Sequence, residues 1–152
     1  MQLLTAFVST TALVLVTTSG AFAQARPDFS GTWTFDPASL PAAPAGGGVG
    51  PPGELTLRQD AGTLTIEYGP TPAVRYNLDG SESRNWDGTS KAMWQDNRLV
   101  IVTPLNAGGR EIELRRVLSM DGADLVMEMT LPSLQGGDPT VRRFVYKKRL
   151  LP

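Results

Sequence analysis

The chain contains no histidine and no cysteine among its 152 residues. Without histidine it lacks the usual general base of a Ser-His-Asp site and the commonest ligand of zinc, copper and haem. Without cysteine it can form no disulfide, and lipoprotein processing at a lipidated cysteine is excluded. We therefore expect a protein that uses carboxylates, hydroxyls, amines, aromatic rings or shape, with no metal site, no cofactor and no enzymatic activity.

The chain also lacks an excess of either charge, because 14 basic residues face 15 acidic ones. No overall field draws in nucleic acid or an anionic membrane. The segment "RRFVYKKR" (142–149) is basic with two aromatic residues between the charges, a pattern seen in nucleic-acid-binding strands. Since the rest of the chain has no basic excess, we expect a solvated strand there and no nucleic-acid partner, and the sequence identifies no protein partner.

Charge is absent altogether from the first 23 residues, which end in Ala21-Phe22-Ala23. Small residues at these two alanine positions are what signal peptidase reads, so we expect 1–23 to be a signal peptide cleaved after Ala23. The protein would then be exported, to the periplasm or beyond it, and 24–152 would contain no transmembrane segment. The alternative is an uncleaved membrane anchor. The seven Ser and Thr residues before Gly20 argue against it, because they interrupt the apolar segment.

The remaining sequence shows apolar residues at every second position in short runs bounded by Gly, Pro, Asn and Asp, with little helical periodicity. Hairpins such as "RQDAGTLTIEY" and "SMDGADLVMEM" turn at an aspartate and resume with one apolar face. Short connections favour a sequential antiparallel meander, and closure buries the apolar face and removes the edges. We predict an all-β fold, a single up-and-down antiparallel barrel of about 8–10 strands, over 24–152. The predicted strands are 30–36, 54–59, 63–68, 73–79, 82–86, 90–95, 98–104, 110–119, 124–131 and 140–148.

One connection is long. In residues 37–53, "PASLPAAPAGGGVGPPG", ten of 17 residues are Pro or Gly, so this stretch cannot join a sheet. It is either a lid over the mouth of a cavity or a plain mobile loop between the first two strands.

The first predicted strand carries the motif "DFSGTWTFD" (28–36), in which Gly31 allows close backbone approach and Trp33 lies on the same face. This resembles the Gly-x-Trp first strand of lipocalin-like, calycin-type barrels. It is also similar to the start of small exported bacterial proteins predicted to share that fold. The segments "YNLDG", "SKAMWQDNRLVI" and "FVYKK" resemble other parts of those proteins, so the resemblance spans most of 24–152. It implies that Trp33 plugs the closed end against an arginine of the last strands (Arg142, Arg143 or Arg149), and that a small apolar or amphipathic molecule binds inside.

Alternation along "REIELRRVLSM" would bring Arg116 to the interior, on the face of Ile112 and Leu114. An arginine beside a tyrosine hydroxyl can anchor a carboxylate, an arrangement that loosely resembles fatty-acid-binding barrels. The alternative is a bulge at Arg115-Arg116 that returns both to solvent. We favour the bulge, because a buried unpaired arginine costs several kcal/mol.

The aromatic residues, Trp86 included, either line a cavity or fill the barrel. For the methionines, a place in the core is a simpler explanation than a role in ligand binding. Aspartates such as Asp79, Asp87 and Asp121 precede glycine, which turn chemistry explains. The candidate ligand-binding residues are Trp33, Tyr68, Tyr76, Trp94, Arg116, Met127, Arg142, Phe144 and Tyr146.

These observations favour an exported lipocalin-like protein that binds a small hydrophobic or amphipathic ligand in its barrel. The alternative is a non-catalytic protein-interaction module, such as an inhibitor or an envelope accessory protein. An empty cavity lined by tryptophan would favour the first function, and a filled lumen the second.

Overall fold

The computed structural model describes residues 25–40, 51–133 and 137–150. The regular elements confirm the predicted all-β class, and the one helical element is a short 3-10 turn, η1 (Pro37–Ser39). No helix in these ranges is long and apolar enough to cross a membrane. The strands are β1 (Gly31–Phe35), β2 (Glu54–Gln59), β3 (Thr63–Glu67), β4 (Val74–Asn77), β5 (Asp79–Asn85), β6 (Gly88–Gln95), β7 (Arg98–Ala107), β8 (Arg110–Asp121), β9 (Asp124–Leu131) and β10 (Thr140–Lys148).

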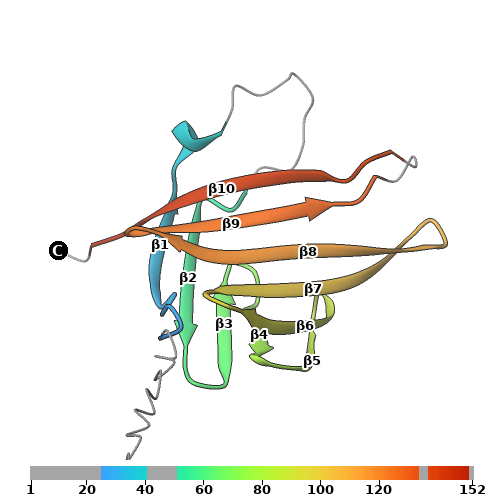
Figure 1. Ribbon diagram of the computed structural model, residues 1–152, viewed down its shortest axis with the longest axis horizontal. Helices are drawn as coiled ribbons and strands as arrows, with labels where there is room; N and C mark the ends of the chain where they lie inside the picture. The colour runs from blue at the N-terminus through green and yellow to red at the C-terminus, as the bar shows by residue number, and fades with distance from the viewer. Residues whose placement is uncertain (1–24, 41–50, 134–136, 151–152) are drawn as a thin grey trace, which may run out of the picture.

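All ten strands belong to one antiparallel sheet, in the order β4-β3-β2-β1-β10-β9-β8-β7-β6-β5. Consecutive strands pair with each other except β4 and β5, and β1 also pairs with β10, so the predicted meander is confirmed. Figure 1 shows the long strands β7 to β10 crossing the shorter β1 to β4. The sheet curls until its two edge strands, β4 and β5, lie side by side, which gives a nearly closed barrel.

Side chains close the seam between β4 and β5 in place of a backbone ladder. The Asn85 Oδ1 atom accepts from the Arg75 N–H at 2.8 Å, and the Asn85 Nδ2 atom donates to the Arg75 carbonyl at 3.0 Å. One amide side chain thus copies both hydrogen bonds of a paired residue. The Ser83 hydroxyl likewise accepts from the Asn77 N–H at 2.8 Å.

Replacing Asn85 with alanine should loosen this seam, because both hydrogen bonds to Arg75 disappear. Each contributes about 0.5 to 1.5 kcal/mol, so we expect a loss of about 1 to 2 kcal/mol and faster hydrogen exchange of the Arg75 amide. Asn85→Asp keeps the acceptor and loses the donor, so its free energy of unfolding should lie between those of the wild-type protein and Asn85→Ala. Denaturant unfolding and amide exchange measured by NMR check both variants. Unchanged protection of Arg75 in Asn85→Ala would show that the seam is held elsewhere.

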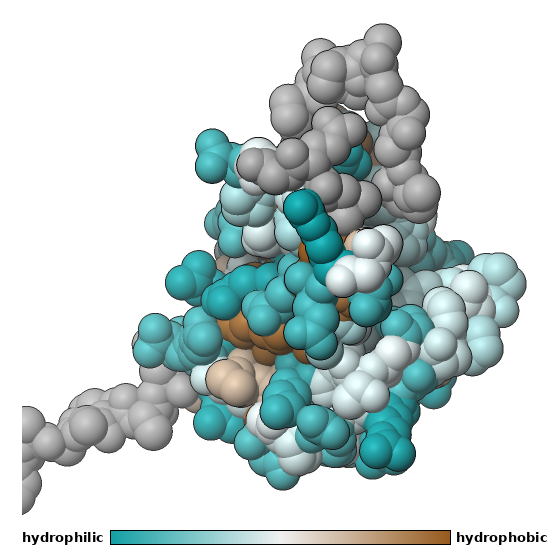
Figure 2. All heavy atoms as spheres, turned by 90° about the vertical axis from the view of Figure 1, so that its right-hand side faces the viewer, coloured by the Kyte–Doolittle hydropathy of each residue, from teal (hydrophilic) through white to brown (hydrophobic). Residues whose placement is uncertain are grey.

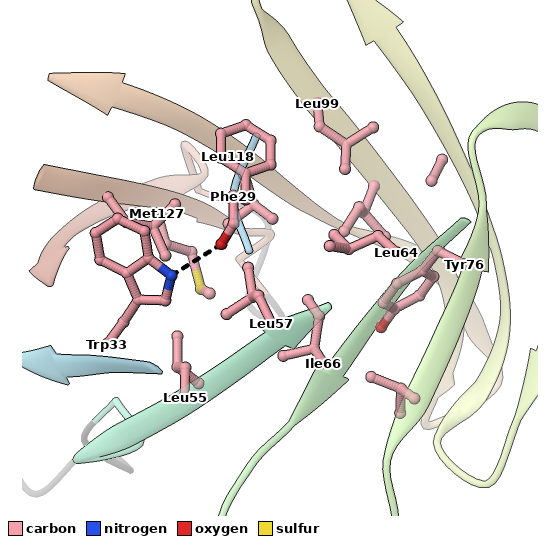
Figure 3. Close-up of a cluster of buried hydrophobic side chains, with 14 of the residues drawn as sticks. Phe29, Trp33, Leu55, Leu57, Leu64, Ile66, Tyr76, Leu99, Leu118 and Met127 are labelled. Carbon is pink, nitrogen blue, oxygen red and sulfur yellow. Dashed lines mark hydrogen bonds between the residues drawn. The ribbon is translucent and has the colours of Figure 1, made fainter. Parts of the chain in front are cut away.

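The N-terminal segment before β1 folds under the barrel and closes one end. Trp33 is fully buried, and its indole N–H donates to the Phe29 carbonyl at 2.9 Å (Figure 3). The Gln59 side chain holds the same segment, accepting from the Phe29 N–H and donating to the Pro27 carbonyl. Around Trp33 and Tyr76 the lumen is packed with leucine and isoleucine side chains (Figure 3). The structure therefore places Trp33 as the predicted plug of the closed end.

Gly31 allows the close approach that the motif requires. Its φ of +140° is one that side-chain-bearing residues rarely adopt, and a Cβ there would lie 2.9 Å from the Lys148 Cε atom. The Lys148 ammonium lies 5.4 Å from the centre of the Trp33 ring. The expectation of an arginine from Arg142, Arg143 or Arg149 is therefore wrong, because the register pairs Trp33 with Lys148.

The long connection starts with η1, capped by the Asp36 side chain, and ends just before β2. Its central part, 41–50, lies outside the described residues, as does the predicted signal peptide. The choice between lid and plain loop therefore stays a prediction.

Candidate ligand site around Arg116

The structure places Arg116 inside the barrel, with only 7% of its surface exposed. Its neighbours in the sheet are Ile101 on β7 and Met129 on β9, and the register runs through Arg115 without a break. The favoured bulge at Arg115-Arg116 is therefore wrong. Unbroken alternation carries Arg116 inward, and the surrounding polar groups compensate for its burial.

Neutral hydroxyls surround the guanidinium of Arg116. Nη1 donates to the Tyr68 hydroxyl at 3.1 Å, and Nη2 donates to the Tyr76 hydroxyl at 3.0 Å and to Thr103 Oγ1 at 3.3 Å. The Thr103 hydroxyl is also bonded to that of Ser90, at 2.8 Å. The sequence suggested an arginine beside a tyrosine hydroxyl, and the structure contains this arrangement. It involves two tyrosines, Tyr76 on β4 and Tyr68 just after β3.

A carboxylate completes this cluster at a longer distance. Asp87, in the turn between β5 and β6, has its Oδ2 atom 3.9 Å from Arg116 Nη2, and its side chain is 23% exposed. Within the described residues, Asp87 Oδ1 and Arg116 Nε are buried without a hydrogen-bond partner. The cluster thus has one free donor and one free acceptor on two neighbouring groups.

The charge states of Arg116, Tyr68 and Tyr76 are fixed over a wide pH range. Burial lowers the pKa of Arg116, but Tyr68, Tyr76 and Asp87 together outweigh it, so the pKa of this guanidinium is raised. Burial also raises the pKa of the Tyr68 hydroxyl and that of Tyr76, against the opposing effect of Arg116. The arginine is therefore a permanent cation, and the tyrosines stay neutral.

An alkaline titration should show this burial directly. The chain has three tyrosines, and burial raises the pKa of Tyr68, Tyr76 and Tyr146 alike. Because the folded pKa lies above the unfolded value of about 10, the resulting stabilisation is complete below that pH and is lost as the pH rises through the folded value. We expect no tyrosinate absorbance near pH 10 in the native protein, and a cooperative rise only on unfolding. A gradual rise with unchanged circular dichroism would contradict this, and the urea-unfolded chain is the control.

Within the described ranges, none of the other predicted ligand-binding residues has a side-chain hydrogen bond to this cluster. Trp33 fills the closed end, and Trp94 lies half-buried beside Phe29 at that same end. Met127, Phe144 and Tyr146 belong to the packed core.

Two predictions about side-chain position are wrong. Arg142 is exposed, because it lies on the part of β10 that runs toward the open end, where water reaches its inward face. Trp86, in the turn between β5 and β6, is 60% exposed, and its indole donates to the Pro72 carbonyl.

Sequence reasoning missed three members of the cluster. Ser90 and Thr103 are buried polar residues at positions where alternation places an apolar one, and this signal was present in "SKAMW" and "LVIVT". The turn before Gly88 already explained an aspartate at position 87, so its proximity to Arg116 was not predicted.

An apolar surface extends from Arg116 toward the open end of the barrel. Its residues share the inward face, since Thr103 pairs with Leu114, Leu105 with Ile112, and Arg116 with Met129. The apolar residues of this surface are half-buried, whereas those of the core are fully buried. Figure 2, which looks at this end, shows apolar surface framed by hydrophilic side chains. We call this surface the apolar ledge; it comprises Leu105, Ile112, Leu114, Met129 and Leu131.

Two recesses lie away from the cluster. One of about 420 Å³ is at the closed end beside Trp94, and one of about 250 Å³ is on the outer surface near Lys91 and Val102. In the described ranges no group of three or more carboxylates is placed to hold a metal ion.

Comparison with known proteins identifies no family. No protein-family model matches the chain, and no curated protein matches it. Among solved structures it is similar to a mutant of the fluorescent protein UnaG, with 20% sequence identity and a TM-score of 0.49 over 79% of this chain and 95% of that chain.

Proposed function

We propose that the protein holds a small amphipathic molecule at the open end of its barrel without transforming it. The polar end would bind at Arg116 and the apolar part would lie along the apolar ledge. The observation that carries this proposal is the buried guanidinium whose Nε–H has no acceptor in the described part of the chain. A buried charge that is only partly hydrogen-bonded costs free energy, so a ligand acceptor at this atom binds favourably.

Asp87 decides which polar end fits best. A ligand carboxylate at Arg116 would lie near the Asp87 carboxylate, and like charges at this distance repel. A group with both an acceptor and a donor, such as a primary amide, offers a partner to Arg116 Nε and one to Asp87 Oδ1. The preferred ligand therefore has a neutral polar end and an apolar tail.

Calorimetric titration with a medium-chain primary amide and the carboxylate of equal length tests this preference. The wild-type protein should bind the amide more tightly, and Asp87→Asn should raise carboxylate affinity about tenfold, equivalent to about 1.4 kcal/mol. Asp121→Asn is the matched control, because Asp121 also precedes a glycine in a hairpin turn but lies at the other end of β8. Failure of both amphiphiles to bind, or equal carboxylate affinity in wild type and Asp87→Asn, would overturn the proposal.

The packed lumen favours a second candidate function, the protein-interaction module. Trp33, Tyr76 and Tyr146 are fully buried and fill the lumen, while the apolar ledge remains half-exposed. A half-exposed apolar surface framed by polar groups also suits a protein partner. Native mass spectrometry of protein from its own compartment separates the two: an extra mass of metabolite size, lost in Tyr68→Phe, supports the ligand, and a stoichiometric protein complex disrupted by Ile112→Glu supports the partner.

We also propose that the protein is exported after cleavage between Ala23 and Gln24. The uncharged leader and its Ala-Phe-Ala end support this. Intact mass measurement of protein from the host should give a chain that begins at Gln24 in the periplasm or the medium. A chain retaining Met1 in the membrane fraction would contradict it and support the uncleaved anchor.

A further inference from the structure

The recess of about 420 Å³ at the closed end has the composition of a binding site. It lies beside the turn between β2 and β3, at the end of the barrel that Trp33 closes, and is therefore separate from the Arg116 cluster. Its size falls in the range of small-molecule sites. The residues around it that matter here are Arg26, Gly62, Leu78, Asp79, Met93 and Trp94.

Trp94 provides an aromatic surface held in a fixed position. Its ring stacks on that of Phe29, with centres 5.7 Å apart and an interplanar angle of 17°, and Phe29 is fully buried. The guanidinium carbon of Arg26 lies 5.4 Å from the centre of the Trp94 ring. This is the distance and pairing of a cation–π interaction, which is strongest with tryptophan.

The rest of the recess also suits a cation. Hydrogen bonds from the Ser81 hydroxyl and N–H lower the pKa of Asp79, so this carboxylate is ionised at neutral pH. Met93 is 43% exposed and offers a polarisable thioether wall. An aromatic face, a fixed carboxylate and a thioether together favour an organic cation of modest hydration.

Arg26 itself occupies this position loosely. Its side chain is exposed, and it forms no salt bridge with any other described residue. A contact of this kind at an exposed site contributes about 0.5 to 1 kcal/mol. An external guanidinium therefore competes with Arg26 at little cost.

We propose that the closed-end recess recognises a guanidinium compound of the size of an arginine side chain, and that Arg26 is its internal, displaceable occupant. The site takes the cation on the ring of Trp94, and Asp79 and Met93 line the same recess. This inference is independent of the proposed ligand at Arg116, because the two sites share no residue.

Titration with N-acetyl-arginine amide, followed by NMR of the tryptophan indole protons, tests the proposal. Arg26→Ala removes the competing occupant and should bind this probe about three- to sixfold more tightly than the wild-type protein, the gain expected from losing a competing contact of that strength. N-acetyl-citrulline amide has the same shape without the charge and should bind neither protein. The shifted signal should be the indole proton of Trp94, and those of Trp33 and Trp86 should stay in place.

A second variant keeps the test decisive. Asp79→Asn retains the oxygen that accepts from Ser81, so the turn stays intact while the charge is lost. In the Arg26→Ala background it should weaken binding several-fold, whereas Asp121→Asn should not. Equal binding of the citrulline compound, equal affinity in wild type and Arg26→Ala, or no effect of Asp79→Asn would overturn the proposal.

Discussion

Replacing Arg116 with methionine is expected to lower the free energy of unfolding by about 3 kcal/mol, although it exchanges a buried charge for an apolar side chain. The substitution removes the donors to Tyr68 and Tyr76 and, among the described residues, the only cation within 4 Å of the Asp87 carboxylate. A buried polar group without a partner costs about 1 to 3 kcal/mol, and breaking a buried charge pair costs about 3 to 5 kcal/mol. The exposed edge of Asp87 lets water recover part of this, so the expected loss is near the lower value. Urea denaturation measures it.

A double-mutant cycle with Tyr76→Phe separates the arginine's hydrogen bonds from its packing. If the Tyr76 hydroxyl matters mainly as a partner of Arg116, its removal should cost little once methionine is present, with a coupling energy of about 1 kcal/mol. The exposed Arg98→Met is the control and should change stability by less than about 0.5 kcal/mol. A more stable Arg116→Met protein would instead show that the arginine is retained at a cost to stability, as expected of a residue kept for binding.

The strands could be predicted from sequence because their information is local. Alternation in "TLTIE" and "DLVMEM", with aspartate and glycine at the turns, sets both the strand and the face that it buries. Short connections then leave few topologies besides the meander. The pairing of β1 with β10, which links the two ends of the chain, follows from closure and not from any local signal.

The Arg116 cluster could be predicted only in part, because its members come from six different strands and loops. Alternation alone places Arg116 inside, but the argument against burial depends on which partners are available. Those partners, Tyr68 and Tyr76, lie 48 and 40 residues away. Asp87 was correctly placed in a turn, and nothing local shows that the turn ends beside a buried guanidinium.

The error at Arg142 has a different cause. Its face was predicted correctly, since it pairs with Met129 and shares that residue's side of the sheet. What alternation does not supply is the distance along the barrel axis, and the same face is buried at Tyr146 and open to water at Arg142. A period of two predicts which face of the sheet a residue lies on. Whether that face is buried at that position depends on how far the neighbouring strands extend.

Trp33→Ala should destabilise the protein by about 4 to 5 kcal/mol, the upper range for a large aromatic core residue. The indole is fully buried, and it also donates the hydrogen bond that holds the Phe29 carbonyl. Its loss therefore leaves a cavity and releases the segment that closes the barrel. For a domain with a total stability of about 5 to 15 kcal/mol, this is a large fraction of the whole.

Trp33→Phe divides this effect into its two parts, because it keeps an aromatic ring and removes only the N–H donor and part of the volume. Its cost should be about 1 to 2 kcal/mol, with increased hydrogen exchange around Phe29 and in Gln59, which hold the same segment. Trp86→Ala is the matched control: its ring is mostly exposed, so only the bond to Pro72 is lost and the cost should stay below about 1 kcal/mol. Similar losses for Trp33→Ala and Trp86→Ala would mean that the first strand does not close the barrel. A large loss for Trp33→Ala, with the Arg116 cluster still assembled at low denaturant, would show that the closed end and the candidate ligand site unfold as separate units.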